Sequence, residues 1–468
     1  MNGGSRGFTV FNTSGEIVYT SGNDLEHMAA RFGHYPDSRS ENKGNEPENV
    51  EYGSFDNHPF LFVNSERSSL VFVYDISDPE NPVYHQTLPA ASAPEGALAI
   101  PSRNLLVVAS ENDSRGDKMR AGLNIYSYEA DAASYPTVES ADRADGTPIA
   151  WGAMSGLSSD PDDDTILYSI EDSYYQQNRI FTIDVSTTPA TLTNELRITD
   201  ANDVFASIAV TELVDPTVDD TDSTRLEVFD SADLALMIND DKTVNIDPEG
   251  IAKASDGGFW VASEGAGTIG DAGRPVNSLN FIFKTDAAGV IEQVITLPDT
   301  INANQIRFGF EGVAEYNGNV YVAFQRAWTG DATPRIGIYN TTAGTWSFLY
   351  YPLDSVESQN RGWVGLSDLT SMGNGQFLVL ERDNQGGPDA AIKRIYQIDT
   401  NGVADGDTLT KTLVRDLMDD LAAPGGLIYE KIEGMALMSN NDVWIINDND
   451  GVEDNSGETQ LINLGNIQ

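Results

Sequence analysis

An acid followed by glycine and small apolar residues recurs along this chain. It reads DPEGIA at 247–252, FEGVAEY at 310–316 and IEGMAL at 432–437. A second acid or amide follows 13 to 18 residues later in most of these segments. Carboxylate and amide oxygens are the ligands that Ca²⁺ prefers. The sequence therefore predicts calcium binding, with ligands drawn from Glu95, Glu111, Glu249, Glu264, Glu311, Asp368, Glu381, Glu433, Asn447 and Asp448.

Three arginines directly follow the second polar position of a segment. They are Arg67, Arg326 and Arg382. A guanidinium group binds planar anions well, so we expect these residues to hold a substrate anion beside the calcium. The alternative is structural: the acids pair with these arginines or accept hydrogen bonds from loop amides.

Several other chemistries are excluded. The chain has no cysteine, and its four histidines all lie in the first 85 residues, outside the repeated segments. A Ser-His-Asp triad is therefore not expected, and no phosphate-binding or dinucleotide glycine motif is present. Metal-activated water, paired carboxylates and arginines that bind an anion remain.

The acids must be positioned by strands, because each segment opens a unit of three or four short apolar or alternating runs. Seven such units begin at residues 46, 93, 151, 247, 309, 365 and 431. This pattern predicts an all-β, seven-bladed β-propeller with one small sheet per blade. The first strand leaves one mouth of the channel and the second returns to it, so the acids should gather at that mouth.

The last unit lacks a fourth strand, and residues 1–20 form a predicted hairpin without a partner. We expect this hairpin to complete the last blade. The predicted organisation is one domain over residues 1–468. It comprises the closing hairpin and an acidic insertion (1–45), blades one to three (46–198), a second insertion (198–245) and blades four to seven (246–468).

Charge limits the partners. The chain holds 73 Asp and Glu against 27 Lys and Arg, a net charge of −46. Nucleic acid is excluded as a partner, because phosphate binding depends on Lys and Arg. No apolar run is long enough to span a membrane. The acidic surface suits salty water, cation binding, or both.

The segments DPEGIA, FWVASEG, FGFEGVAEY, LVLERD and KIEGMAL resemble the family described as "esterase-like activity of phytase", over about residues 145–468. The earlier GEIVYTSGNDLE, VYDISDPENP and APEGALAI resemble bacterial choice-of-anchor I surface proteins. The resemblance implies an exported bacterial propeller, located outside the cell, on its surface or in the periplasm, and trimmed from a longer chain with further domains. It also implies phosphoester hydrolysis, although the lysine cluster expected of a calcium-dependent propeller phytase is missing.

Three functions fit these observations. The first is a metal-dependent phosphoester hydrolase of the phytase or phosphatase type, acting on a small anion or ester. The second is a calcium-dependent lactonase or esterase. The third is a non-catalytic surface or matrix propeller that calcium stiffens.

Overall fold

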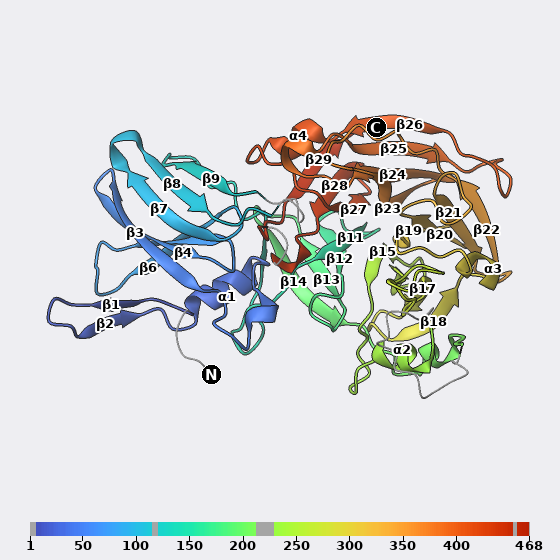
Figure 1. The fold of residues 1–468 in the computed structure, drawn as a ribbon, viewed down its shortest axis with the longest axis horizontal. Helices are drawn as coiled ribbons and strands as arrows, with labels where there is room; N and C mark the ends of the chain where they lie inside the picture. The colour runs from blue at the N-terminus through green and yellow to red at the C-terminus, as the bar shows by residue number, and fades with distance from the viewer. Residues whose placement is uncertain (1–5, 115–119, 212–228, 453–455, 468) are drawn as a thin grey trace. The chain divides into compact units, whose positions relative to one another are not determined.

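The chain is built almost entirely from short strands, as the sequence predicts. The computed structural model describes residues 6–114, 120–211, 229–452 and 456–467. The acidic stretch VDPTVDDTDST (214–224) of the predicted insertion and residues 453–455 lie outside this description. The chain divides into two compact units (Figure 1), described separately below.

The first unit comprises Met1–Ala153, Asp184–Asn194 and Asp448–Leu461. Its sheets are β1 (Thr9–Phe11) with β2 (Ile17–Thr20); β3 (Pro47–Phe55), β4 (His58–Ser65), β5 (Leu70–Asp75) and β6 (Val83–Pro89); and β7 (Pro94–Ile100), β8 (Leu105–Ser110) and β9 (Gly122–Ser127). β10 (Val138–Ser140) pairs in parallel with the start of β14 (Ala190–Arg197). The helical segments are α1 (Asp24–Arg31), η1 (Asp37–Arg39), η2 (Pro101–Arg103) and η5 (Asp450–Val452).

Alternation along β4 builds two apolar layers in this unit. Phe60 and Phe62 face the sheet β7–β9 and pack with Leu106 and Val108. Val63 faces the opposite side and joins the cluster that contains Leu25 of α1. A strand buried on both faces reads as a nearly continuous apolar run, which explains HPFLFV at 58–63.

The second unit comprises Met154–Ile183, Glu195–Asn447 and Ile462–Gln468. Its sheets contain β11 (Met154–Ser159), β12 (Ile166–Glu171) and β13 (Arg179–Asp184); β15 (Pro248–Lys253), β16 (Phe259–Ser263), β17 (Phe281–Thr285) and β18 (Ile291–Thr296); β19 (Phe310–Tyr316), β20 (Asn319–Phe324), β21 (Arg335–Asn340) and β22 (Thr345–Tyr350); β23 (Val364–Gly373), β24 (Gln376–Asp383), β25 (Lys393–Asp399) and β26 (Lys411–Asp416); and β27 (Ile432–Leu437), β28 (Asp442–Asn447) and β29 (Leu461–Asn466). Short helical turns connect them: η3 (Val204–Ser207), α2 (Ser231–Leu236), α3 (Asp299–Asn302), η4 (Gly387–Asp389) and α4 (Met418–Ala422).

The first strands of these five sheets close a ring. β15 packs between β11 and β19, β23 packs between β19 and β27, and β27 packs beside β11. This is the arrangement of a β-propeller. The predicted ring of seven is wrong in its count, because β27 meets β11 directly and leaves no room for the sheets that begin with β3 and β7.

Glycine permits this close approach. A Cβ added to Gly250 would lie 2.5 Å from the Glu311 carbonyl oxygen and 2.8 Å from the Gly312 Cα. At Gly434 it would lie 3.0 Å from the Gly156 carbonyl carbon. Glycine inside a strand commonly marks such contact between backbones. The small residues that recur in the sequence are therefore explained by packing at the ring axis.

The predicted closure by the N-terminal hairpin is also wrong. β1 and β2 form a separate two-stranded sheet, and the last sheet keeps only β27, β28 and β29. The hairpin belongs to the first unit, where the Phe8 ring lies 5.0 Å from the Tyr74 ring and 5.5 Å from the Tyr19 ring. This aromatic contact draws the hairpin to β5 of its own unit.

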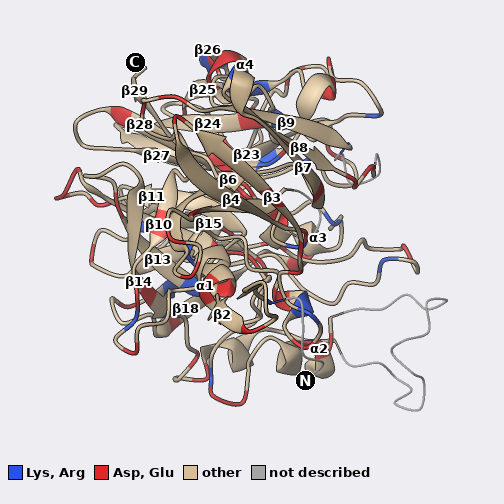
Figure 2. Cartoon of the chain, turned by 90° about the vertical axis from the view of Figure 1, so that its left-hand side faces the viewer, with Lys and Arg blue, Asp and Glu red and all other residues tan. Residues whose placement is uncertain are grey.

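Acidic residues lie along many loops of the described part of the chain (Figure 2). None of the helices in the described ranges has the length and apolar character needed to cross a bilayer.

Replacing Gly250 with alanine tests the packing at the ring axis. The new methyl group would meet backbone atoms, which cannot rotate away, so we expect Gly250→Ala to lower the free energy of unfolding by about 1–3 kcal/mol. Gly425 has no heavy atom near its added Cβ, so Gly425→Ala is the matched control. Urea denaturation of both variants gives the comparison, and equal midpoints would contradict the packing account.

Candidate functional site

A β-bulge places the repeated glutamates. In the pair β15–β16, Pro248 lies opposite Ser263 and Gly250 opposite Ala262, which leaves Glu249 as the extra residue. The pairs β27–β28 and β19–β20 shift register at Glu433 and at Glu311–Gly312. A bulge turns a side chain out of the regular pleat, and bulges are common next to functional sites. The backbone bulge therefore sets the direction of each glutamate side chain. Each of these glutamates directly precedes a glycine of the ring axis.

Three carboxylates meet where β15 begins and β16 ends. Each of Asp247, Glu249 and Glu264 offers an oxygen, and these oxygens lie within 4.8 Å of one another. We call this set the mouth cluster. The Glu264 amide donates to the Asp247 carbonyl oxygen at 2.8 Å, and the Glu264 Oε1 accepts from the Gly309 amide at 2.6 Å.

Glu249 and Glu264 concentrate negative charge in the mouth cluster. Burial, and then repulsion from Glu311 and Asp247, raises the pKa of Glu249 well above its usual range. Burial and the neighbouring Asp247 raise the pKa of Glu264 to about 8. Neither Glu249 nor Glu264 forms an ion pair within the described part of the chain. Protons or a cation must therefore neutralise the cluster.

Two further acids are buried behind the mouth cluster. Glu311 accepts a hydrogen bond from the Gln325 side chain, and burial followed by repulsion from Glu264 raises its pKa. Glu433 pairs with Arg382, whose Nε also donates to the Ser367 hydroxyl at 2.7 Å. The Arg382 Nη1 is buried and has no hydrogen-bond partner in the described ranges. This guanidinium holds the acid but retains one donor to spare.

Unpaired arginines stand beside the acids. The Arg326 guanidinium lies 4.7 Å from the Phe308 ring centroid and 4.9 Å from that of Trp363, and Arg307 lies 4.4 Å from Phe308. Burial lowers the pKa of both arginines, and the pKa of Arg307 is lowered further by Arg274. None of these three arginines has an ion pair among the residues that the structure describes. In a chain with 73 acids, free arginines that repel one another are typical of an anion site.

Comparison with known families agrees with the two-unit description. The family model described as "Phytase-like: Esterase-like activity of phytase" matches residues 149–451, more than half of the chain. This chain belongs to the phytase-like family. A choice-of-anchor I domain matches residues 1–79. Both resemblances noted in the sequence are confirmed, and the phytase-like match includes the mouth cluster and the neighbouring arginines.

Other comparisons add little. Curated protein sequences include no match to this phytase-like chain. Solved structures with some similarity include a nidogen–laminin complex (10% identity, TM-score 0.31, 63% of this chain and 72% of that chain). Others are the hydrazine synthase of Kuenenia stuttgartiensis (12%, 0.30, 90% and 96%) and a luciferin-regenerating enzyme (10%, 0.32, 76% and 84%). TM-scores this low support no argument about fold or function.

The phytase-like unit does not bring all of the predicted ligands together. Glu249, Glu264, Glu311 and Glu433 interact electrostatically at the mouth of the ring. Arg67, Glu95, Glu111 and Asp448 belong to the first unit, and Asn447 ends β28 in the second. The Asp448 carboxylate accepts from the Asp450 amide at 2.7 Å, within a turn.

The structure places Asp368 and Glu381 one residue away from the positions predicted to bind calcium. The bulge of β23 falls at Ser367, so Asp368 takes the position that glycine holds in β15, β19 and β27. The Asp368 Oδ2 accepts from the Met435 amide at 2.6 Å and its Oδ1 accepts from the Leu369 amide, which ties β23 to β27 at the ring axis. Burial raises the pKa of Asp368 well above its usual range.

Glu381 is directed into its own sheet. It pairs with Lys411 at 2.6 Å and accepts from the Asp354 amide at 2.7 Å. Arg382, one residue later, occupies the position equivalent to Glu264. The two ligand positions of this blade are therefore held by Ser367 and Arg382, neither of which is a carboxylate.

The sequence reading missed Asp247, Arg307 and the aromatic pair Phe308–Trp363. Asp247 could have been found, because acid–Pro–Glu opens two of the repeated units, as EPE at 46–48 and DPE at 247–249. In both units the backbone carbonyl of the first acid accepts a hydrogen bond from the residue that follows the second strand. The Glu66 amide donates to the Glu46 carbonyl, and the Glu264 amide donates to the Asp247 carbonyl. The arginine–aromatic stack joins distant loops and leaves no local signal.

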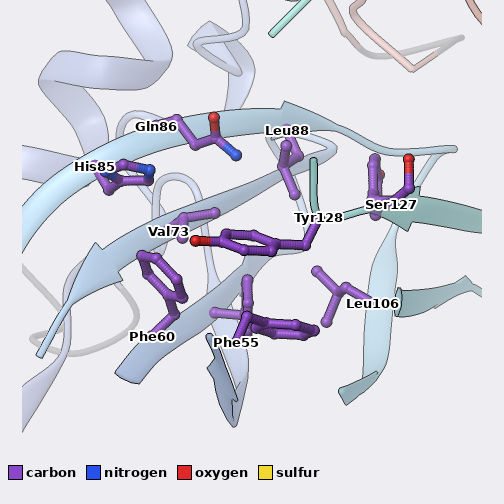
Figure 3. A pocket seen from close by; sticks show the side chains of 11 residues that line it. Phe55, Phe60, Val73, His85, Gln86, Leu88, Leu106, Ser127 and Tyr128 are labelled. Carbon is purple, nitrogen blue, oxygen red and sulfur yellow. The ribbon is translucent and has the colours of Figure 1, made fainter. Parts of the chain in front are cut away.

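The first unit contains an apolar cavity of about 70 Å³ between β3–β6 and β7–β9. Figure 3 shows the Tyr128 ring in this cavity near Phe60, Val73 and Leu88. Its walls contain no acid, and His85 is its only ionisable group apart from tyrosines. The cavity is a gap between packed sheets and lacks the groups that hydrolysis requires.

Breaking the Arg382–Glu433 pair tests its structural role. Arg382→Met leaves Glu433 buried without its charge partner, so we expect the free energy of unfolding to fall by about 3–5 kcal/mol. Arg415→Met breaks an exposed pair with Asp420 and should cost less than about 1 kcal/mol. Chemical denaturation measures both. A double variant, Arg382→Met with Glu433→Gln, should recover part of the loss, and failure to do so would contradict the assignment.

Stability in chelator should depend on pH with a defined sign. The pKa of Glu264 rises from 4.5 when unfolded to about 8 when folded, so the native state binds more protons between these values. The melting temperature should therefore fall as pH rises from about 5 to 8. Glu264→Gln should flatten this fall, because the amide does not titrate. If the melting temperatures of the two proteins changed with pH in parallel, the pKa of Glu264 would not be raised in the folded state.

Proposed function

We propose that this phytase-like chain hydrolyses phosphate esters with a calcium ion bound by the mouth cluster. The observation that supports the proposal is the placement of Glu249 and Glu264 in the same ring mouth as Arg307, where none of the three forms an ion pair within the described ranges. Glu264 acts electrostatically on Arg307, and Gly309, two residues from Arg307, donates to the Glu264 carboxylate. Opposite charges this close that do not form ion pairs are suited to a cation and an anion bound side by side.

The donor set fits calcium. Asp247, Glu249 and Glu264 supply carboxylate oxygens only, and hard cations of large radius accept six to eight oxygen ligands in flexible geometry. Zinc prefers histidine and cysteine, and the chain has no cysteine. When bound, the cation supplies charge neutralisation and polarises the phosphoryl oxygen.

The protein residues then have distinct tasks. Arg307 and Arg326 bind the non-bridging phosphoryl oxygens, and the Arg326 guanidinium is held against the Phe308 and Trp363 rings. Arg382 positions Glu433 and keeps one N–H available. A carboxylate of the ring mouth that is not bound to the cation accepts the proton of the attacking water.

The choice-of-anchor I match supports an exported or surface-attached protein. A lactonase or esterase and a non-catalytic surface propeller are the other candidates. A neutral lactone does not require the arginines, so the effect of an arginine variant separates the two hydrolases.

Hydrolysis of p-nitrophenyl phosphate and p-nitrophenyl acetate in calcium tests the proposal. We expect Glu264→Gln to lower kcat/KM for the phosphate at least about tenfold, a loss of ~1.4 kcal/mol. Arg326→Gln should raise KM for the phosphate and leave acetate unchanged. The controls are Asp162→Asn, in an exposed turn, and Arg103→Gln, which is exposed in the first unit.

Four results would contradict the proposal. Activity in excess chelator would exclude the cation, and equal losses in Glu264→Gln and Asp162→Asn would exclude the mouth cluster. Turnover of the acetate alone would favour the esterase, and turnover of neither substrate would favour the non-catalytic propeller.

A further inference from the structure

A second group of carboxylates lies in the first unit, outside the phytase-like match. Glu66, Glu95 and Glu111 each offer an oxygen, and these lie within 4.8 Å of one another. Glu95 is the extra residue of a bulge, between Pro94 opposite Ser110 and Gly96 opposite Ala109. Glu66 and Glu111 follow the ends of β4 and β8. A β-bulge therefore places Glu95 in the same way that a β-bulge places Glu249 in the mouth cluster.

The three carboxylates are not balanced by the cations around them. Arg67 pairs with Glu66 at 2.9 Å, and Glu95 and Glu111 have no ion pair within the described ranges. Three negative charges and one positive charge leave a net charge of −2. By contrast, Glu46 nearby is surrounded by Arg39, Lys43 and Arg67.

A buried amide, Asn64, lies near the end of β4 and precedes Glu66 by two residues. Asn64 is 0% exposed, and neither its Oδ1 nor its Nδ2 has a hydrogen-bond partner among the residues that the structure describes. Side chains alternate along a strand, so Asn64 lies on the same face of β4 as Phe60 and Phe62, toward the sheet that carries Glu95 and Glu111. A buried polar group left unpartnered calls for a water or an ion in contact with it.

The space beside the carboxylates is polar. A cavity of about 310 Å³ is lined by Glu66 and Glu111, by Ser92 and Asn112, and by Arg39 and Arg67, which pair with Glu46 and Glu66. The Asn112 Nδ2 donates to the Ser92 hydroxyl at 3.2 Å. This volume holds an ion together with several waters, and its wall supplies further oxygen atoms.

We propose that the first unit binds one calcium ion through Glu66, Glu95 and Glu111, with the Asn64 amide oxygen as a fourth ligand. Two positive charges cancel the net charge of −2, and waters in the cavity complete the coordination. Calcium suits the site better than magnesium, because magnesium demands near-octahedral geometry and releases its waters reluctantly. The ion links the ends of two sheets, so its role is to fasten them together. Burial, and then Glu48 and Glu46 against the opposing effect of Arg67, raises the pKa of Glu66 to about 7, which agrees with a site that lacks positive charge.

Calorimetric titration of the whole chain with CaCl₂ tests this site independently of the mouth cluster. In a Glu264→Gln background, which weakens the mouth cluster, we expect calcium binding to persist. Adding Glu111→Gln should weaken the remaining binding at least tenfold. Adding Glu80→Gln, an exposed acid on the β5–β6 loop, should leave it unchanged.

Melting temperatures separate loss of the ion from misfolding. In chelator, the Glu111→Gln variant should melt no lower than its parent, since removing one of three like charges relieves repulsion. Calcium should then raise its melting temperature by less than it raises that of the parent. The proposal is overturned if the Glu264→Gln protein binds no calcium, or if Glu111→Gln and Glu80→Gln bind calcium equally. Unchanged hydrolysis in the Glu264→Gln protein, with calcium still bound in the first unit, would contradict the proposed function and leave this site intact.

Discussion

The close approach of five inner strands at the ring axis is the constraint on which the second unit depends. Backbone meets backbone at Gly156, Gly250, Gly312 and Gly434, where a side chain would collide. At the fifth strand Asp368 replaces glycine and bonds to the Met435 amide, so the ring is closed by a hydrogen bond at that point. The residue before each glycine occupies a bulge and cannot point into the pleat. The positions of Glu249, Glu311 and Glu433 are therefore consequences of packing.

Electrostatics then decides what this geometry can do. Three of these positions carry glutamate, and the mouth cluster adds Asp247 and Glu264. Arg382 compensates Glu433, and Gln325 satisfies Glu311 without removing its charge. The remaining charge must be met by protons or a cation, which connects stability to pH and to metal. The free arginines beside Phe308 add an attraction for anions that the net charge of −46 otherwise opposes.

The sequence predicts the strands, the repeated hairpin and the glutamates of the mouth, because these follow from alternation, turn residues and a recurring motif. It does not predict where the ring closes, since seven similar units are equally compatible with one ring of seven or a ring of five and a separate unit. The bulge caused the errors at Asp368 and Glu381: an extra residue shifts every later side chain by one position, and LSDL at 366–369 does not reveal where it falls. Arg307 and Phe308 share one loop, and Arg326 and Trp363 come from two others, so the stacking of Arg326 depends on the tertiary fold.

Anomalous X-ray diffraction from crystals grown in calcium tests the central claim most directly. The account predicts an anomalous peak between the carboxylates of Asp247, Glu249 and Glu264, with oxygen ligands at about 2.3–2.6 Å. A well-ordered mouth without a peak, with Glu249 and Glu264 bonded only to backbone amides, would contradict it.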